Sequence, residues 1–131
     1  MPGRLNYALV VDDDEFAQSN LCGSLRALGF GTIYSANNGR SAVSTLDLMP
    51  HPPELIICDV FMPDMDGIEF VVELSRRRYL GGLILVTGVS KDMLEVAKDI
   101  ALSSGIHVLG SFTKPLSPKT LAFTLGFVGS Y

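Results

Sequence analysis

Three acidic residues directly follow apolar runs in this sequence, and they could together hold a cation. Asp12 and Asp13 follow the run 5–11, and Asp59 follows the run 55–58. Carboxylates that share a site repel one another, so their ionised forms need a compensating positive charge. Hard oxygen ligands with room for water suit Mg²⁺. The acidic residues therefore predict a magnesium site, provided that the fold brings them together.

A hydroxyl and an amine extend this group of polar residues. Thr87 ends the apolar run 83–87, and Lys114 follows the last apolar run. Phosphoryl transfer to a carboxylate requires such a set, because a cation and a lysine neutralise the phosphoryl oxygens while the aspartate attacks in line. Taken singly, the residues have plainer interpretations: an aspartate after a strand often caps a turn or a helix, and a Lys-Pro pair usually marks a loop. Their joint occurrence favours the chemical interpretation.

Strand-like and helix-like segments alternate five times, and this alternation predicts how the polar residues are positioned. Continuous apolar runs indicate strands buried on both faces, and apolar residues at helical spacing indicate amphipathic helices. The expected strands are 5–11, 32–36, 55–58, 83–87 and 106–110. The expected helices lie near 16–28, 42–46, 68–78, 93–101 and 118–125. The pattern predicts an α/β fold, a single doubly wound five-stranded parallel sheet with helices on both faces, whose carboxyl ends share one edge.

Several turn residues are expected to separate these segments. Gly29 and Gly105 are suited to end helices, and residues 37–39 have the composition of a turn. Pro118 is suited to the first turn of the last helix. No repeat or linker interrupts the pattern, so we expect one domain over residues 1–131.

The composition is that of a globular domain and excludes several function classes. The chain has 47% hydrophobic and 18% charged residues, and its formal charge is −4. That charge argues against a nucleic-acid surface, which would normally show a basic patch. The first residues lack the apolar core of a secretory signal, and no apolar stretch approaches the length of a membrane span. We therefore expect no direct nucleic-acid partner, no membrane partner and a cytoplasmic location.

Four short motifs stand in a specific order along the chain. They are Val10–Asp13, Asp59 with Met62–Gly67, Val86–Gly88, and Lys114–Pro115. In type, order and spacing they resemble the motifs of the receiver domain of two-component response regulators, over nearly the full length of the chain. The resemblance implies a flavodoxin-like fold with strand order 2-1-3-4-5. It also implies a phosphoacceptor signalling domain that catalyses only its own phosphorylation and dephosphorylation.

The resemblance implies a role for each acidic residue. Asp59 would accept the phosphoryl group and contribute to the binding of Mg²⁺. Asp13 would bind Mg²⁺ directly, and Asp12 mostly through water. The main-chain carbonyl of Phe61 would complete the protein ligands of the metal.

The resemblance also implies how the phosphoryl group is supplied and sensed. It would come from a sensor histidine kinase or a phosphotransfer protein, because neither His51 nor His107 is placed to be a phosphohistidine. Thr87 would be the switch hydroxyl that moves toward the phosphoryl group, and Lys114 would pair with Asp59 or its phosphate. The bond from Lys114 to the following proline is expected to be cis. A downstream output domain or protein is implied, and the family allows a phosphorylation-dependent homodimer.

Three positions depart from the usual receiver pattern. The family usually has Tyr or Phe three residues before the lysine, where this chain has Ser111, and the nearby Phe112 is expected to point to the other side of its strand. We therefore expect a weaker or different conformational response. Phe61 and Val89 stand two residues beyond the acceptor and the threonine, and neither side chain can position an attacking water. A long-lived phosphoryl group is expected.

The same residues suggest an output domain and allow the alternative functions to be compared. The segment 107–116 resembles receivers that precede a cyclic-di-GMP phosphodiesterase domain, which suggests a related output. The main alternative is a pseudo-receiver that binds partners independently of phosphorylation, and Ser111 leaves room for it. A small Mg²⁺-dependent phosphatase would need a general acid where Phe61 stands. A nucleotide-binding module would need a glycine-rich phosphate loop after a strand, and the sequence has none.

Overall fold

Five apolar runs form the strands of one parallel sheet. The computed structural model describes residues 7–62 and 65–126. The strands are β1 (Tyr7–Val11), β2 (Thr32–Ala36), β3 (Leu55–Asp59), β4 (Gly82–Thr87) and β5 (His107–Thr113). They pair in the order β2-β1-β3-β4-β5, and every pair is parallel. The predicted fold class and strand order are therefore confirmed.

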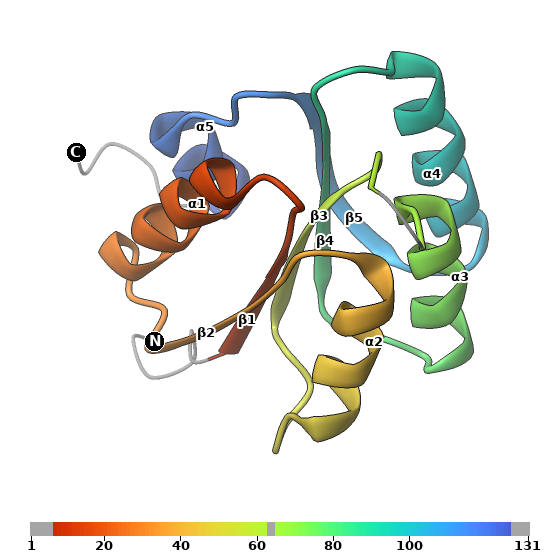
Figure 1. Ribbon diagram of the computed structural model, residues 1–131, viewed down its shortest axis with the longest axis horizontal. Helices are drawn as coiled ribbons and strands as arrows, with labels where there is room; N and C mark the ends of the chain where they lie inside the picture. Colours follow the sequence, from red (N-terminus) through yellow and green to blue (C-terminus); the bar gives the residue numbers. More distant parts are fainter. Residues whose placement is uncertain (1–6, 63–64, 127–131) are drawn as a thin grey trace.

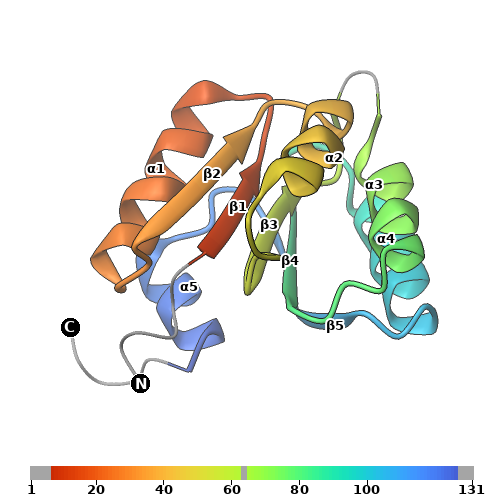
Figure 2. The ribbon, with the colours of Figure 1, turned by 90° about the horizontal axis from the view of Figure 1, so that it is seen from below.

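The described helices follow the strands in alternation and cover both faces of the sheet. They are α1 (Glu15–Ala27), α2 (Gly39–Leu48), α3 (Gly67–Arg76), α4 (Lys91–Ser103) and α5 (Pro118–Thr124). Figures 1 and 2 show α1 and α5 against one face and α2, α3 and α4 against the other. Within residues 7–62 and 65–126, no helix is long and apolar enough to cross a bilayer.

Each face of the sheet buries its own apolar cluster, and this burial keeps the strand ends in place. The cluster beneath α2, α3 and α4 includes Phe70 and Leu83, and the cluster beneath α1 and α5 includes Leu25, Ile57 and Leu121. These five side chains are fully buried. Each contributes about 1.5–3 kcal/mol of hydrophobic free energy relative to an exposed side chain. The strand ends that carry the polar residues therefore rest on a closely packed support.

Helix α3 and strand β5 end at different residues from those that the sequence predicts. Helix α3 ends at Arg76, not at Arg78, because Arg78 takes a left-handed backbone conformation with φ 54°. The following Tyr79 N–H then donates to the carbonyl of Leu74, at 3.1 Å, and closes the end of the helix. The last strand begins one residue late and runs on to Thr113, so that β5 is longer than predicted. The first two residues of the predicted strand 5–11 lie outside the described residues.

The predicted turn residues are confirmed with one adjustment. Gly29 and Gly105 have φ values of 107° and 82° directly after helices, where glycine tolerates the left-handed conformation best. Asn38 is the N-cap of α2 and accepts a hydrogen bond from the Ser41 N–H at 2.8 Å. Gly39, which was expected to belong to the turn, is therefore the first residue of the helix.

Candidate functional site

The predicted convergence of the acidic residues is present at the carboxyl edge of the sheet. Asp12 and Asp13 follow β1, and Asp59 is the last residue of β3. One carboxylate oxygen from each lies within 4.8 Å of the others. Three carboxylates so close together repel strongly when ionised, and hard oxygen donors of this kind suit Mg²⁺.

Asp12 has an unsatisfied buried oxygen, which tests whether the site fits a cation. The Asp12 side chain is fully buried, and its Oδ1 accepts a hydrogen bond from the Asp14 N–H at 2.9 Å. Its Oδ2 lies 2.8 Å from Lys114 Nζ but accepts no hydrogen bond of good geometry. The ion pair with Lys114 compensates the charge of this oxygen, but its lone pairs have no hydrogen-bond donor among the described residues. Together with the exposed Asp13 carboxylate, this oxygen fits a site for a divalent cation.

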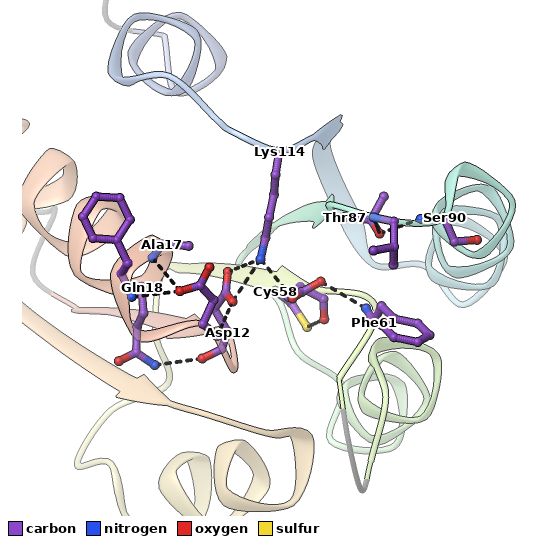
Figure 3. A network of polar contacts seen from close by, with 12 residues as sticks. Asp12, Ala17, Gln18, Cys58, Phe61, Thr87, Ser90 and Lys114 are labelled. Atoms are coloured by element: carbon purple, nitrogen blue, oxygen red, sulfur yellow. Dashed lines mark hydrogen bonds and ion pairs between the residues drawn. The ribbon is translucent and has the colours of Figure 1, made fainter.

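Lys114 connects two of the three carboxylates. Its Nζ donates to Asp12 Oδ1 at 3.0 Å and to Asp59 Oδ2 at 3.1 Å. Figure 3 shows the Lys114 side chain extending toward Asp12. Burial lowers the pKa of Lys114, but the hydrogen bonds and charges of these two aspartates raise that pKa further, so it lies above its usual range. The ammonium group is therefore charged at neutral pH.

The backbone of Lys114 is fixed as well as its side chain. Its N–H donates to the carbonyl of Thr87 at 2.8 Å, which ties the end of β5 to the end of β4. The bond from Lys114 to Pro115 is cis, as predicted. The lysine is therefore held from both ends above the acidic cluster.

Asp59 is a buried carboxylate with one oxygen toward the lysine and one toward the next turn. Its exposed fraction is 3%. Its Oδ1 accepts a hydrogen bond from the Phe61 N–H at 3.1 Å. Burial raises the pKa of Asp59 from 3.8 to about 6, although the hydrogen bonds from Lys114 and Phe61 act in the opposite direction. The carboxylate is still ionised at neutral pH, which a nucleophile requires.

The turn after β3 is held closely at both ends. The Gly67 N–H donates to the carbonyl of Val60 at 2.8 Å, and a Cβ at Gly67 would lie 2.6 Å from Val60 Cα. The Gly39 N–H donates to the carbonyl of Met65 at 3.2 Å, and a Cβ at Gly39 would lie 2.5 Å from that oxygen. These contacts restrict the turn that carries Phe61, the residue whose carbonyl is a predicted metal ligand.

Two apolar side chains flank the opening to Asp59. Phe61 and Val89 are 54% and 72% exposed, and both line a cavity of about 190 Å³ together with Asp13, Asp59 and Lys114. Neither apolar side chain offers a hydrogen-bond donor or acceptor to a water in this cavity. Access to Asp59 is therefore lined by apolar groups at the two positions identified from the sequence.

Thr87 lies at the predicted strand end, but its hydroxyl is bonded to a different group. The side chain is buried, and its Oγ1 accepts from the N–H groups of Val89 and Ser90, each at 3.3 Å. Ser90 is in turn the N-cap of α4 and accepts from the Met93 N–H at 3.1 Å. Figure 3 shows Thr87 and Ser90 apart from Asp12 and Lys114. Among the described residues, no hydrogen bond joins Thr87 Oγ1 to Asp59.

Ser111 and Phe112 face opposite sides of β5, as predicted. Ser111 pairs with Leu85, which belongs to the cluster beneath α2, α3 and α4. Phe112 pairs with Val86 and packs against the cluster beneath α1 and α5. The face toward Thr87 and α4 therefore has no aromatic residue at position 111.

One polar residue near the acidic cluster was not identified from the sequence. The side-chain amide of Gln18, in α1, donates to the carbonyls of Asp12 and Ala36. A glutamine within a helix carries no sequence signal for such a role, because its partners are backbone carbonyls. His51 and His107 are exposed, and within the described residues no group of potential metal ligands includes them.

Sequence comparisons agree with this geometry. Residues 8–125 match the family described as response regulator receiver domain. The chain is 32% identical over 91 residues to the transcriptional regulatory protein PdtaR of Mycobacterium tuberculosis, which covers 70% of this chain and 43% of PdtaR. It is 28% identical over 117 residues to the cyclic di-GMP phosphodiesterase RocR of Pseudomonas aeruginosa, which covers 89% of this chain and 30% of RocR. The chain spans less than half the length of these relatives.

Solved structures resemble the chain over nearly their whole length. A response regulator from Colwellia psychrerythraea is 34% identical with a TM-score of 0.76, covering 92% of this chain and 94% of that one. The chemotaxis protein CheY4 of Vibrio cholerae is 26% identical with a TM-score of 0.75, covering 95% and 98%. The chain therefore belongs to the response regulator receiver domain family, phosphoacceptor modules of two-component signalling that are not classical enzymes.

Proposed function

We propose that the chain, as one receiver domain over residues 1–131, accepts a phosphoryl group on Asp59 in a Mg²⁺-dependent reaction. The observation that carries this proposal is the position of Lys114 Nζ, within hydrogen-bond distance of both Asp12 and Asp59 in a cluster of three carboxylates. A fixed cation beside a buried nucleophile stabilises negative charge that develops on a transferred group. The complete acidic set supports chemistry at this edge more than a purely structural role.

Each residue of the site has a distinct part in the proposed transfer. An Asp59 oxygen bonds to phosphorus while the bond from phosphorus to the donor's nitrogen or oxygen breaks, and the donor keeps that electron pair. Lys114 neutralises charge on the phosphoryl oxygens. Asp12, Asp13, Asp59 and the carbonyl of Phe61 would hold Mg²⁺, which when bound supplies further positive charge to the phosphoryl group. Burial of Asp12 and Asp59 strengthens the interactions of these two carboxylates because water screens them less.

The proposed donor is a sensor histidine kinase or a phosphotransfer protein. A cavity of about 350 Å³ lies beside Lys114 and is lined by Phe16, Leu21, Pro115 and Leu116 among others. Phe16 is 76% exposed on the first turn of α1. An apolar surface next to a phosphoacceptor is suited to a helical partner that presents a histidine. A cytoplasmic location follows from a donor of this kind.

The phosphorylated form is proposed to act on an output domain or protein. The Thr87 hydroxyl would rotate away from the N–H groups that precede α4 and toward the phosphoryl group. This movement would alter the surface of α4 and β5. The chain matches 30% of the length of RocR, which is a cyclic di-GMP phosphodiesterase. A cyclic-di-GMP phosphodiesterase is therefore one proposed output. Phosphorylation-dependent pairing of two copies is another route to a response.

A pseudo-receiver is the second candidate, and one observation favours it. Thr87 Oγ1 accepts hydrogen bonds from the N–H groups of Val89 and Ser90, and position 111 lacks the aromatic side chain that is usual in receivers. A domain of this kind would bind its partner with the same affinity whether or not Asp59 carries a phosphoryl group.

Incubation with acetyl phosphate and Mg²⁺, followed by intact mass measurement, tests the proposal. We expect a phosphate adduct on the wild type that is absent in Asp59→Ala and in wild type treated with EDTA. Asp47→Ala, which removes an exposed aspartate of α2, is the control and should keep the adduct. No adduct on the wild type under any Mg²⁺ concentration would favour the pseudo-receiver.

A further inference from the structure

Gln18 joins the first helix to the ends of two strands. Its side-chain Nε2 donates to the carbonyl of Asp12 at 3.1 Å and to the carbonyl of Ala36 at 3.0 Å. The Asp12 N–H also donates to the carbonyl of Ala36, at 3.0 Å. Figure 3 shows the Gln18 side chain extending from α1 toward the backbone beside Asp12. The two amide hydrogens of one side chain therefore bridge the carboxyl ends of β1 and β2.

These bonds lie where the regular support of the sheet ends. The pairing of β1 with β2 stops at Val11 and Ala36, so Asp12 and Asp13 have no strand partner on that side beyond one backbone bond. Asp13 is exposed, and its position depends on the backbone that Asp12 fixes. Gln18 supplies the next constraint along the chain, on the carbonyl that directly precedes Asp13.

The chemistry of an amide suits this place. Gln18 offers two donors to two carbonyl oxygens without adding charge beside the carboxylates. A carboxylate at position 18 would place acceptors against two carbonyls, and an aliphatic side chain would leave both carbonyl lone pairs without this donor. Neutrality also keeps the negative potential of the acidic cluster, which attracts a cation.

We propose that Gln18 is a positioning residue that holds the Asp12–Asp13 pair in the geometry required for Mg²⁺. This inference rests on the proposed function for its metal. Gln18 touches neither the phosphoryl group nor the cation, and it acts through the backbone of Asp12. Residues that orient metal ligands in this way typically change metal affinity by about 10–100-fold when they are replaced.

Calorimetric titration of the EDTA-treated, dialysed full chain with Mg²⁺ tests the inference. Gln18→Met keeps the length of the side chain and removes both donors, and we expect its Mg²⁺ Kd to rise about tenfold. Ser19→Ala, on the exposed side of α1, should keep the wild-type Kd. Gln18→Asn, whose amide is one methylene too short, provides a second variant with the same expected loss if Gln18→Met does not fold.

The rate of phosphorylation by acetyl phosphate separates positioning from general destabilisation. In Gln18→Met the rate should fall at low Mg²⁺ and return to the wild-type rate at saturating Mg²⁺. Equal Mg²⁺ Kd values for the wild type and both Gln18 variants would overturn the inference, even if Asp59 is phosphorylated. A raised Kd in a chain that acetyl phosphate does not phosphorylate would support Gln18 while the proposed function fails. A wild type that binds no Mg²⁺ overturns the inference.

Discussion

The acidic half of the site and the half around Thr87 differ in how their side chains are connected. In the acidic half, Lys114 bonds to both Asp12 and Asp59, so three segments distant in sequence share one network. In the other half, the Thr87 hydroxyl accepts hydrogen bonds, among the described residues, only from the turn that follows it. The hydroxyl of Ser111 makes no hydrogen bond to the described residues. Side-chain hydrogen bonds of the acidic half therefore join segments distant in sequence, whereas those of the Thr87 hydroxyl join neighbouring residues.

This difference separates the chemistry of the domain from its response. A network that spans strand ends fixes Asp59, the proposed acceptor, and the other proposed metal ligands and Lys114 relative to one another before any ligand arrives. The local bonds of Thr87 can be exchanged at small cost, since a neutral hydrogen bond contributes about 1 kcal/mol. We therefore expect large effects from changes in the acidic half and small effects from changes in the other.

The largest effect is expected from removing the countercharge. Lys114→Met keeps the aliphatic chain and removes the ammonium group from between the two carboxylates. The rate of Asp59 phosphorylation by acetyl phosphate should fall by about 10²–10³-fold, the usual loss when one group that stabilises developing charge is removed. Lys119→Met, which removes an exposed lysine of α5, is the matched control. A Lys114→Met rate within a few-fold of the wild type would show that the network does not serve the transfer.

A pH-dependent stability effect is expected from Asp59 in the absence of metal. The pKa of Asp59 is raised by burial to about 6, so the native state holds this proton more tightly than the unfolded chain does. The free energy of unfolding should therefore fall as pH rises from about 4 to about 6, by up to about 3 kcal/mol. Asp59→Asn should lose this decrease.

Urea unfolding of both proteins in EDTA at pH 4 and pH 7 measures that difference. We expect Asp59→Asn to be more stable than the wild type at pH 7, by more than at pH 4. Mg²⁺ should stabilise the wild type more than the variant. A difference between the two proteins that does not change with pH would mean that burial does not raise the pKa of Asp59.

An intermediate effect is expected at the opening of the site. Phe61→Asn places a polar side chain where it can position water against the phosphoryl group. The rate of dephosphorylation should rise by about tenfold, a modest share of what positioned groups contribute to water attack. Leu80→Asn, at a 93% exposed position after α3, is the control for an apolar-to-amide change. Rapid loss of the phosphoryl group in the wild type, unchanged by Phe61→Asn, would refute the expectation of a long-lived phosphate.

The smallest effect is expected from introducing an aromatic residue in the half around Thr87. With beryllofluoride and Mg²⁺ as a phosphoryl mimic, amide shifts of the wild type should change in the turns around Asp59 and only weakly across α4 and β5. Ser111→Tyr should extend these changes to α4 and β5. The free-energy difference between the two conformations should change by less than about 1 kcal/mol. A full response of α4 and β5 in the wild type would remove the contrast between the two halves.

The acidic half was predictable from the sequence because strand direction decides it. Once the strands are parallel, residues at their carboxyl ends meet at one edge, so the meeting of Asp12, Asp13, Asp59 and Lys114 followed from their places after apolar runs. The strand order itself came from the family resemblance. Helix ends were less predictable: nothing in the residue type shows that Arg78 takes the left-handed conformation that ends α3.

Side-chain bonds to the backbone were the least predictable features. The hydroxyl of Thr87 has several staggered positions, and the N–H groups of the turn before α4 decide which one it takes. Gln18 was missed for the same reason, because its two acceptors are carbonyls contributed by other segments. Such bonds depend on the assembled fold and not on any residue pattern.

The close approach of Gly39 to Met65 has a consequence for loop engineering. A Cβ at position 39 would lie 2.5 Å from the Met65 carbonyl oxygen, so the turn after β2 and the turn after β3 form one fitted pair. A turn transplanted after β3 from another receiver would keep its geometry here only if its last residues also leave room for a hydrogen-bonding glycine. Loop exchange between such domains should therefore transfer both turns together.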